Sequence, residues 1–252
     1  MPWNPDTYNQ FKEERYQPFY DLISHIHAKD RMSLLDLGCG TGELTEAAAT
    51  RFSAARTLGI DSSAEMLQQA PSQDGISFAH RSIQQQLEAE ERWDLILANA
   101  SLQWVEDHQT LFPRIISRLN PGGQLAVQMP SQKENLLNQL LQQLAQEQPY
   151  YSALSGAVRH SPVLTLDEYT AMLYRCNATE VLLYQKVYPI IASSFETLYT
   201  FISGSALIPY MEKLAEPLKA AFEQEFKHRI AQAFTSTPVV YAFKRIIMVA
   251  SF

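Results

Sequence analysis

The sequence of 252 residues is short of cysteine, glycine and positive charge, and it has no long apolar run. Its two cysteines, Cys39 and Cys176, belong to no CxxC or Cys/His ligand pattern, which argues against a disulfide framework or a zinc site. Lysine and arginine total 20 against 27 acidic residues, and the net charge of −7 argues against a broad nucleic-acid interface or a polybasic membrane anchor. No segment approaches the ~18 apolar residues of a membrane span, and MPWNPDTYNQ has no signal-peptide core. We therefore expect a soluble, cytoplasmic protein that binds neither nucleic acid nor membrane.

Strand and helix patterns alternate along the first half of the chain. Residues 7–27 have helical apolar spacing that Pro18 interrupts, which predicts two short helices ahead of a sheet. A turn is predicted at NPGG, residues 120–123. Such alternation indicates βαβ units and a parallel sheet. The predicted strands are 31–38, 55–61, 75–82, 93–100 and 124–130, and the predicted helices between them are 43–52, 62–70 and 111–119.

The pattern changes after residue 130. Residues 131–165 are rich in Gln, Asn and Leu and predict a polar-faced helix and a loop, and residues 194–235 are again helical. Two further strands are predicted at 178–190 and 239–252, with a helix at 165–176 before them. We expect these last two strands to be neighbours, and both irregular insertions to pack over the ligand edge of the sheet.

A cluster of glycines lies at the first junction between a strand and a helix. Three of the nine glycines, Gly38, Gly40 and Gly42, occur within LLDLGCGTGELT, residues 34–45. Glycine costs conformational entropy, so the cluster indicates positive φ angles or a close approach of another group. In α/β sheets this junction is where ligands bind. A dinucleotide fingerprint would need its third glycine at Glu43 or Thr45, so the spacing is instead D-x-G-x-G-x-G, beginning at Asp36.

An acidic residue closes the second predicted strand. It is Asp61 in TLGIDSS, 23 positions after Gly38, and a carboxylate there can accept hydrogen bonds from both hydroxyls of a ribose. Together LLDLGCGTG and GIDSS resemble motif I and the following acidic loop of class I S-adenosylmethionine-dependent methyltransferases. The resemblance implies an α/β, Rossmann-like sheet, mostly parallel with the last strand antiparallel, and helical cap insertions. It also implies S-adenosyl-L-methionine as cofactor and S-adenosyl-L-homocysteine as product.

The resemblance also assigns roles to matching positions. The glycine turn would lie against the methionine part of the cofactor, Asp36 would help to hold its ammonium group, and Asp61 would bind the ribose. Ser82 stands where the family often has an aspartate for the adenine amine, which weakens that contact. The implied cofactor-binding set is Asp36, Gly38, Cys39, Gly40 and Gly42 at the turn, Asp61, Ser62 and Met66 beside the adenosine, Ser82 and Ile83 at the adenine, and Asn99 and Ala100 beside the transferable methyl.

A narrower resemblance extends over nearly the whole chain. Segments 3–15 (WNPDTYNQFKEER), 98–108 (ANASLQWVEDH) and 119–130 (LNPGGQLAVQMP) are similar to trans-aconitate 2-methyltransferases, and so is AFKRIIMVAS near the end. ANASLQW also resembles the malonyl-acyl-carrier-protein O-methyltransferases of biotin synthesis. Both families esterify a carboxylate. The implied organisation is a single methyltransferase domain, 1–252, with a helical lid (1–30), a cofactor-binding core (31–130) and cap insertions (131–165 and 194–236).

Esterification of a small carboxylic acid is consistent with the absence of catalytic and metal-binding motifs from the sequence. A carboxylate is already anionic at neutral pH, so no general base is required, and neither a Ser-His-Asp set nor HxxxH metal spacing is found. The enzyme instead needs orientation, exclusion of water, and groups that hold the acid. The candidates for substrate binding are Arg15, Gln103, Trp104, Lys244 and Arg245, and His108, Arg159 and His160 are further possible clamps. Because Lys244 and Arg245 are consecutive in a strand, one of the two should point inward or toward the cap.

One departure from the narrower family concerns the substrate. Trans-aconitate methyltransferases carry an arginine in a G-L-R-P-W segment of the cap, whereas this chain reads SALIPYM, with Ile208 before Pro209. The acceptor is then held by another cation, or it is a less charged acid. Two alternatives stay open: an acyl-carrier-protein thioester as acceptor, and a cofactor-binding regulator without catalysis.

Overall fold

The computed structural model describes residues 12–156 and 161–252, and the chain divides into two units. The sheet unit comprises residues 17–130, 162–186 and 245–252. The helical unit comprises the described residues among 1–16, 131–161 and 187–244. Each unit has its own hydrophobic core.

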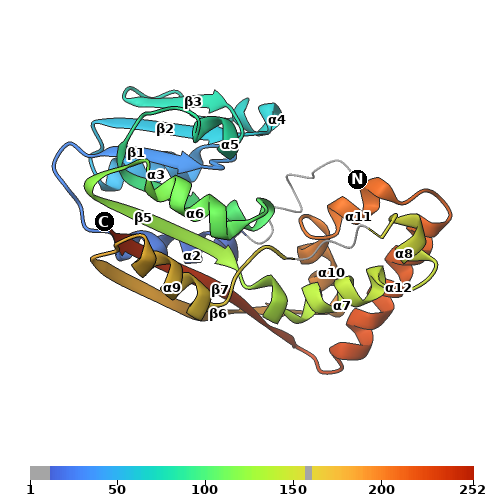
Figure 1. The fold of residues 1–252 in the computed structure, drawn as a ribbon. Coiled ribbons are helices and arrows are strands. Elements are labelled where there is room, and N and C mark those ends of the chain that lie inside the picture. Colours follow the sequence, from blue (N-terminus) through green and yellow to red (C-terminus); the bar gives the residue numbers. More distant parts are fainter. Residues whose placement is uncertain (1–11, 157–160) are drawn as a thin grey trace. The chain divides into compact units, whose positions relative to one another are not determined.

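The sheet has seven strands in the order β3-β2-β1-β4-β5-β7-β6 (Figure 1). Strands β1 to β5 pair in parallel, whereas β7 is antiparallel to β5. The predicted class is therefore confirmed, and so is the prediction that the last two strands are neighbours. The strands are β1 (Ser33–Leu37), β2 (Arg56–Asp61), β3 (Ile76–His80), β4 (Trp93–Asn99), β5 (Leu119–Pro130), β6 (Glu180–Ala192) and β7 (Val239–Ser251).

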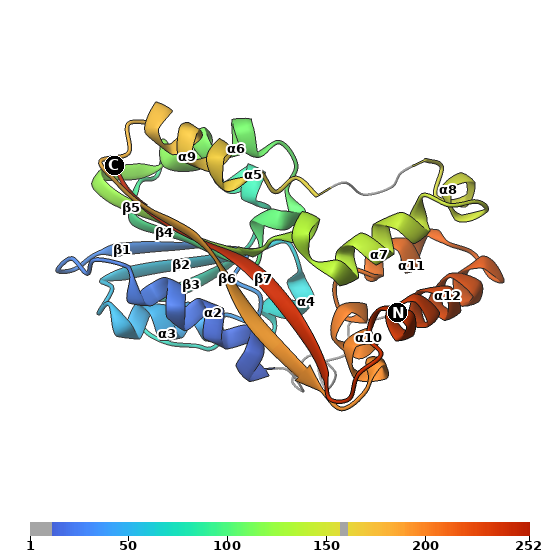
Figure 2. The ribbon, with the colours of Figure 1, turned by 90° about the horizontal axis from the view of Figure 1, so that it is seen from below.

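Helices cover both faces of the sheet, as Figure 2 shows. The face that contains Ile96 and Val127 packs against α6 and α9, and the face that contains Leu97 and Ala126 packs against α2 and α3. Burial on both faces explains the nearly continuous apolar runs of the central strands. The helices of this unit are α2 (Lys12–Ser24), α3 (Glu43–Arg51), α4 (Ala64–Leu67), α5 (Ile83–Gln86), the 3₁₀ helix η1 (Leu102–Trp104), α6 (His108–Ile116) and α9 (Leu166–Arg175).

The predicted break at Pro18 is wrong. Helix α2 continues through Pro18, and Phe19, Leu22 and Ile23 are buried in the core beneath the sheet. Proline removes one backbone hydrogen bond within a helix, and burial of these three side chains offsets that loss. This part of the expected lid segment, 1–30, is thus a core helix, and residues 1–11 lie outside the described residues.

Two predicted boundaries also differ from the structure. The NPGG segment does not precede β5 but lies within it, because the backbone of Gly122 and Gly123 is hydrogen-bonded to Phe252 at the end of the chain. The third strand ends at His80 rather than at residue 82. Ser82 instead caps α5, accepting a hydrogen bond from the backbone N–H of Gln85 at 3.2 Å.

The helical unit is built around an aromatic core. Tyr210 stacks on Phe222 at 5.8 Å between ring centroids, and Tyr241 stacks on Phe243 at the same distance. Across the described part of the chain, no helix is long and apolar enough to cross a membrane. The helices of the unit are η2 (Gln132–Glu134), α7 (Leu136–Ala145), α8 (Tyr150–Ala153), α10 (Phe195–Ser203), α11 (Ile208–Lys213) and α12 (Leu218–Ala233).

Candidate functional site

The sheet order places the glycine turn at a switch point. Strand β1 lies between β2 and β4, and the connections that follow β1 and β4 leave the sheet at the same carboxyl edge. Ligands of α/β sheets bind in the crevice at such a point. Asp36 near the end of β1, Asp61 at the end of β2 and Asn99 at the end of β4 are therefore brought to one edge.

The three positions of the turn require glycine for different structural reasons. All have positive φ, at +81° for Gly38, +57° for Gly40 and +76° for Gly42. A Cβ on Gly38 would lie 2.4 Å from Ser101 Cβ, and one on Gly42 would lie 2.6 Å from the ring of Phe78. At Gly40 the nearest atom is the flexible end of Met66, at 3.3 Å. Gly38 and Gly42 thus let protein segments approach, and Gly40 is the glycine best placed to let a ligand do so.

Asp61 holds the glycine turn in place. Its Oδ2 accepts the backbone N–H of Gly40 at 2.8 Å, and its Oδ1 accepts the N–H of Ser63 at 2.8 Å. The N–H groups of Gly38 and Cys39 both donate to the carbonyl of Ile60, at 2.8 and 2.9 Å. A carboxylate oxygen can accept more than one hydrogen bond, so Asp61 keeps acceptor capacity for a ligand's hydroxyls.

Asp36 is a buried carboxyl group with one partnered oxygen. The residue is 3% exposed, and its Oδ2 accepts a hydrogen bond from Thr45 Oγ1 at 2.6 Å. Its Oδ1 is buried and has no hydrogen-bond partner. Burial raises the pKa of Asp36 to about 7, the Thr45 hydroxyl opposes the rise, and the charge of Asp61 adds to it. A buried orphan acceptor of this kind needs an explanation, and a cationic ligand group supplies one.

The local field at the turn is negative. Burial, followed by the charges of Asp36 and Asp61, raises the pKa of the Cys39 thiol well above its usual range. The thiol is therefore not a nucleophile at neutral pH. Two neighbouring carboxyl groups and an orphan acceptor match a ligand that carries positive charge. Among the described residues, no group of three or more His, Cys, Asp or Glu side chains could hold a metal ion.

The residues expected beside the adenosine lie at the ends of β2 and β3. Met66 is half-buried against Gly40, and Ser62 is exposed. Ser82 is occupied as a helix cap, with its own N–H donating to Gln85 Oε1 at 2.8 Å, and Ile83 is buried in the sheet core. Capping is the physical reason for a serine at this position. Whether these residues contact an adenine stays a prediction.

The segment after β4 is tied to its neighbours. Ala100 has a φ of +54°, and its N–H donates to the carbonyl of Gln128 at 2.8 Å. Ser101 Oγ donates to the carbonyl of Leu37 and so joins this segment to the glycine turn. Gln103 is 4% exposed, and its Nε2 donates to the Ala100 carbonyl at 2.7 Å, whereas Trp104 is 38% exposed. Gln103 therefore shapes the loop, and Trp104 is the more accessible of the two.

The predicted cations have different surroundings. Arg245 is 6% exposed, and its Nη1 donates to Gln128 Oε1 at 2.7 Å, so it is the inward member of the Lys244–Arg245 pair as predicted. Lys244 is half-buried, and its Nζ donates to the carbonyl of Glu134 at 2.9 Å. Arg15 belongs to α2, but its side chain lies outside the described residues, as do Arg159 and His160. Roles of these cations in substrate binding stay predictions.

The proposal of His108 as a clamp is wrong. The residue is 1% exposed, and both ring nitrogens have partners within the core. Its Nε2 lies 3.0 Å from the carbonyl of Leu102, so that nitrogen carries the proton and Nδ1 accepts from the Tyr169 hydroxyl. His108 is the first residue of α6, directly after the N-cap Asp107, and its ring lies in the core rather than at the surface.

Three residues of the site were missed from the sequence. Thr45 is the partner of Asp36, Ser101 fills the space beside Gly38, and Gln128 joins Arg245 to Asn99. Only Gln128 gave a readable signal, because it is a polar residue inside the buried strand QLAVQMP. The other two pairings depend on contacts between separate elements.

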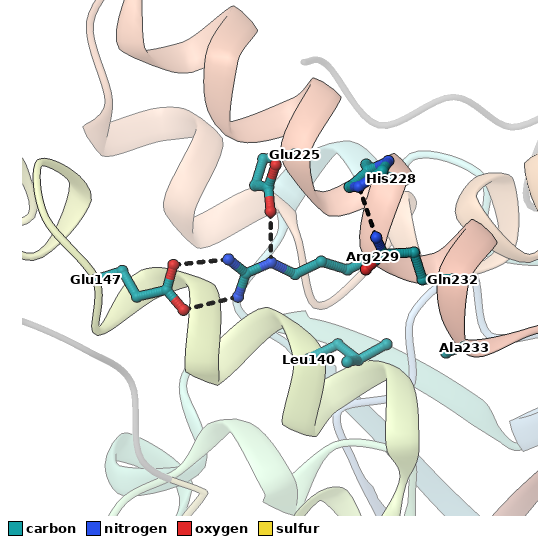
Figure 3. Close-up of a pocket in the computed structure, with 7 residues that line it drawn as sticks. All are labelled: Leu140, Glu147, Glu225, His228, Arg229, Gln232 and Ala233. Atoms are coloured by element: carbon teal, nitrogen blue, oxygen red, sulfur yellow. Dashed lines mark hydrogen bonds and ion pairs between the residues drawn. The ribbon is translucent and has the colours of Figure 1, made fainter.

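A pocket in the helical unit lies between α7 and α12 and has a different character (Figure 3). Arg229 occupies it, paired with Glu147 at 2.6 Å and with Glu225 at 2.8 Å. These pairings raise the pKa of Arg229 above its usual range, and the same contact lowers the pKa of Glu147. The charged groups of this pocket already satisfy one another, so it is a salt-bridged depression rather than a reaction site.

Comparisons with known proteins agree with this geometry. Residues 28–194 match a protein family described as a methyltransferase domain. The chain is 38% identical to a trans-aconitate 2-methyltransferase of Deinococcus radiodurans, over 100% of this chain and 98% of the relative. It is 32% identical to a trans-aconitate 2-methyltransferase of Variovorax paradoxus, over 99% of this chain and 98% of the relative. The YcgJ protein of Bacillus subtilis has a similar fold, with a TM-score of 0.62, 14% identity, and coverage of 94% and 98%. Phosphoethanolamine N-methyltransferase 2 of Haemonchus contortus, in complex with S-adenosyl-L-methionine, has a similar fold with a TM-score of 0.55 and 16% identity. The match covers 93% of this chain and 52% of that protein.

Proposed function

Since the chain belongs to the S-adenosylmethionine-dependent methyltransferases, within the trans-aconitate 2-methyltransferase family, we propose that it esterifies one carboxylate of trans-aconitate. The observation that carries the proposal is the similarity to enzymes of that name over the full length of the chain, at 38% identity in one case. The similarity includes the segments on both sides of the cofactor motif. A likeness of fold alone would not include similarity of sequence in those segments.

The buried groups at the glycine turn support the cofactor. We assign the cofactor's ammonium group to Asp36, whose Oδ1 is buried without a partner, and its ribose to Asp61. At Gly40 the atom nearest to an added Cβ is the flexible end of the Met66 side chain, at 3.3 Å, so of the three glycines it is the best placed for close approach of a ligand. When bound, the cofactor supplies an electrophilic methyl group on a positively charged sulfur. The negative field of Asp36 and Asp61 favours a ligand with that charge.

The residues after β4 support the placement of the acceptor. A carboxylate oxygen of the acid forms the new bond to the methyl carbon as the carbon–sulfur bond breaks, and no proton has to move. The chain then has to orient the acid and exclude water. Asn99 and Trp104 provide an amide and an accessible ring at the end of β4. We assign Asn99 and Trp104 to the acceptor side, and the roles of Arg15 and Lys244 in substrate binding stay predictions.

We expect the purified protein to form a base-labile methyl ester from trans-aconitate and radiolabelled S-adenosylmethionine. A panel of other di- and tricarboxylates and a malonyl carrier-protein thioester tests the acceptor in parallel. Failure to methylate any acid, with cofactor binding intact, would remove the proposed function. Preference for the thioester would instead place the chain with the malonyl carrier-protein enzymes.

Asp61→Asn is expected to lower kcat/KM about 10- to 100-fold. Both oxygens of Asp61 accept a backbone N–H, so the NH₂ group of an asparagine would face one of these donors, and the turn would lose one hydrogen bond to a charged group. Asp94→Asn is the matched control. Asp94 accepts hydrogen bonds from Ser33 and Asn120 at the opposite, amino-terminal edge of β4, so kcat/KM should stay within about threefold at 20 °C. Equal losses in both variants would contradict the assignment of Asp61.

A further inference from the structure

A row of three polar side chains crosses the interior of the sheet unit. Asn99 on β4 and Gln128 on β5 are directly paired in the parallel register, and Arg245 on β7 is paired with Pro130, two residues after Gln128. Asn99, Gln128 and Arg245 therefore project from the same face, the one that packs against α2 and α3. The row ends at the carboxyl edge of β4, where we place the acceptor.

Hydrogen bonds connect the row from end to end. Arg245 Nη1 donates to Gln128 Oε1 at 2.7 Å, and Gln128 Nε2 donates to Asn99 Oδ1 at 2.7 Å. Gln128 is 0% exposed, so both ends of its amide must be satisfied by protein groups. Both distances lie within the ordinary range for N–H···O hydrogen bonds, so each of the two contacts is a well-formed bond.

The guanidinium group fixes the direction of every bond in the row. A guanidinium only donates, so the oxygen of Gln128 must face Arg245 and its NH₂ group must face Asn99. Asn99 then has to present its oxygen to Gln128. Its NH₂ group is left for the carboxyl edge of the strand. Without the cation, both amides could be rotated by half a turn at little cost.

We propose that Arg245 is a positioning residue that acts through Gln128 to make Asn99 a hydrogen-bond donor toward the carboxylate of the acceptor. The inference rests on the proposed function for the identity of the acceptor. A buried positive charge also polarises the two amides in series, which strengthens the donor at the end of the row. The opposite orientation of Asn99 would aim a carbonyl oxygen at an anion.

Gln128→Glu reverses the row while keeping its shape. A glutamate can accept from Arg245 with one oxygen, but its other oxygen requires a donor from Asn99, so the NH₂ group of Asn99 turns inward. We expect KM for trans-aconitate to rise about tenfold or more, with the Kd for S-adenosylhomocysteine unchanged within about twofold. Arg245→Met should raise KM similarly by removing the cation, whereas Arg245→Lys restores a donor and should recover most of the wild-type KM.

A nuclear magnetic resonance measurement tests the orientation without reference to any acceptor. The side-chain NH₂ resonances of Asn99, assigned by their loss in Asn99→Ser, should move downfield in Gln128→Glu, because they then donate to a carboxylate. They should remain in place in Arg245→Lys. Wild-type protein that makes no ester from trans-aconitate would remove the proposed function but leave this readout intact. Unshifted resonances in folded Gln128→Glu, or an unchanged KM there when the wild type is active, would overturn the proposal for Arg245.

Discussion

Gly38→Ala is expected to lower the thermal unfolding midpoint by about 6–12 °C, which corresponds to about 3 kcal/mol for a chain of this size. Two costs combine at this position. An L-residue held at a φ of +81° is strained by about 1–2 kcal/mol, and its Cβ would lie 2.4 Å from Ser101 Cβ. Relief of an overlap of that kind requires backbone movement that costs about 1–3 kcal/mol.

Gly75→Ala separates the two costs. Gly75 has nearly the same φ, +82°, but the atom nearest to an added Cβ is 4.0 Å away. The midpoint of this variant should therefore fall by only about 3–6 °C, which corresponds to about 1.5 kcal/mol of backbone strain alone. Equal midpoints for the two variants would show that the contact with Ser101 is not rigid.

The role of Ser101 can be checked in a double-mutant cycle. Ser101→Gly removes the Cβ that an alanine at position 38 would meet, together with the hydrogen bond to the Leu37 carbonyl. The combined variant should be more stable than the sum of the two single changes predicts, by about 1–2 kcal/mol. An additive result would locate the strain within the turn itself.

The sheet unit was predictable because its signals are local. The strands are buried on both faces and read as short apolar runs, and the helices between them have recognisable beginnings. Position 82 was misassigned although Ser82 and Gln85 form a capping box, whose spacing is visible in the sequence. The break at Pro18 was misassigned for another reason, because the burial of Phe19 and Leu22 is a property of the tertiary structure.

The site was predictable in part, for the same reason. Asp36, the glycines and Asp61 follow a spacing along one chain segment, and the structure gathers them at one edge of the sheet. What each of them contacts was not readable. Ser101 is 63 positions from Gly38, and Arg245 is 117 positions from Gln128, so these partners depend on strand order. Alternation along β7 indicated that one of two cations points inward, but not what it bonds.

Asp36→Asn is expected to stabilise the protein without cofactor while weakening cofactor binding. The pKa of Asp36 is raised from 3.8 to about 7, first by burial and then by the charge of Asp61, with the Thr45 hydroxyl opposing the rise. Between these pH values the unfolded chain releases the proton and the folded chain keeps it, so stability falls as pH rises through this window. The accumulated cost above pH 7 is about 4 kcal/mol, at about 1.4 kcal/mol for each pKa unit.

Asparagine carries no charge and therefore escapes that cost. The unfolding midpoint of Asp36→Asn should exceed that of the wild type by up to about 10 °C at pH 8, and about half of the gain should be lost by pH 5.5. Asp94→Asn is the control with the opposite sign. Burial by itself raises the pKa of Asp94, but hydrogen bonds from Ser33 and Asn120 hold it below its usual range, so this variant should lose stability at neutral pH.

Cofactor binding should respond in the reverse direction. The ammonium group that we assign to Asp36 requires the ionised carboxylate, which in the wild type is formed only as pH approaches 7. The wild-type Kd for S-adenosylhomocysteine, measured by calorimetry, should therefore tighten about tenfold or more between pH 5.5 and 7.5. Asp36→Asn should bind about 30- to 100-fold more weakly at pH 7.5, since a charged hydrogen bond is worth about 2–3 kcal/mol, and its Kd should not vary with pH. A variant that is more stable and still binds normally would show that the buried carboxylate serves some purpose other than the cofactor.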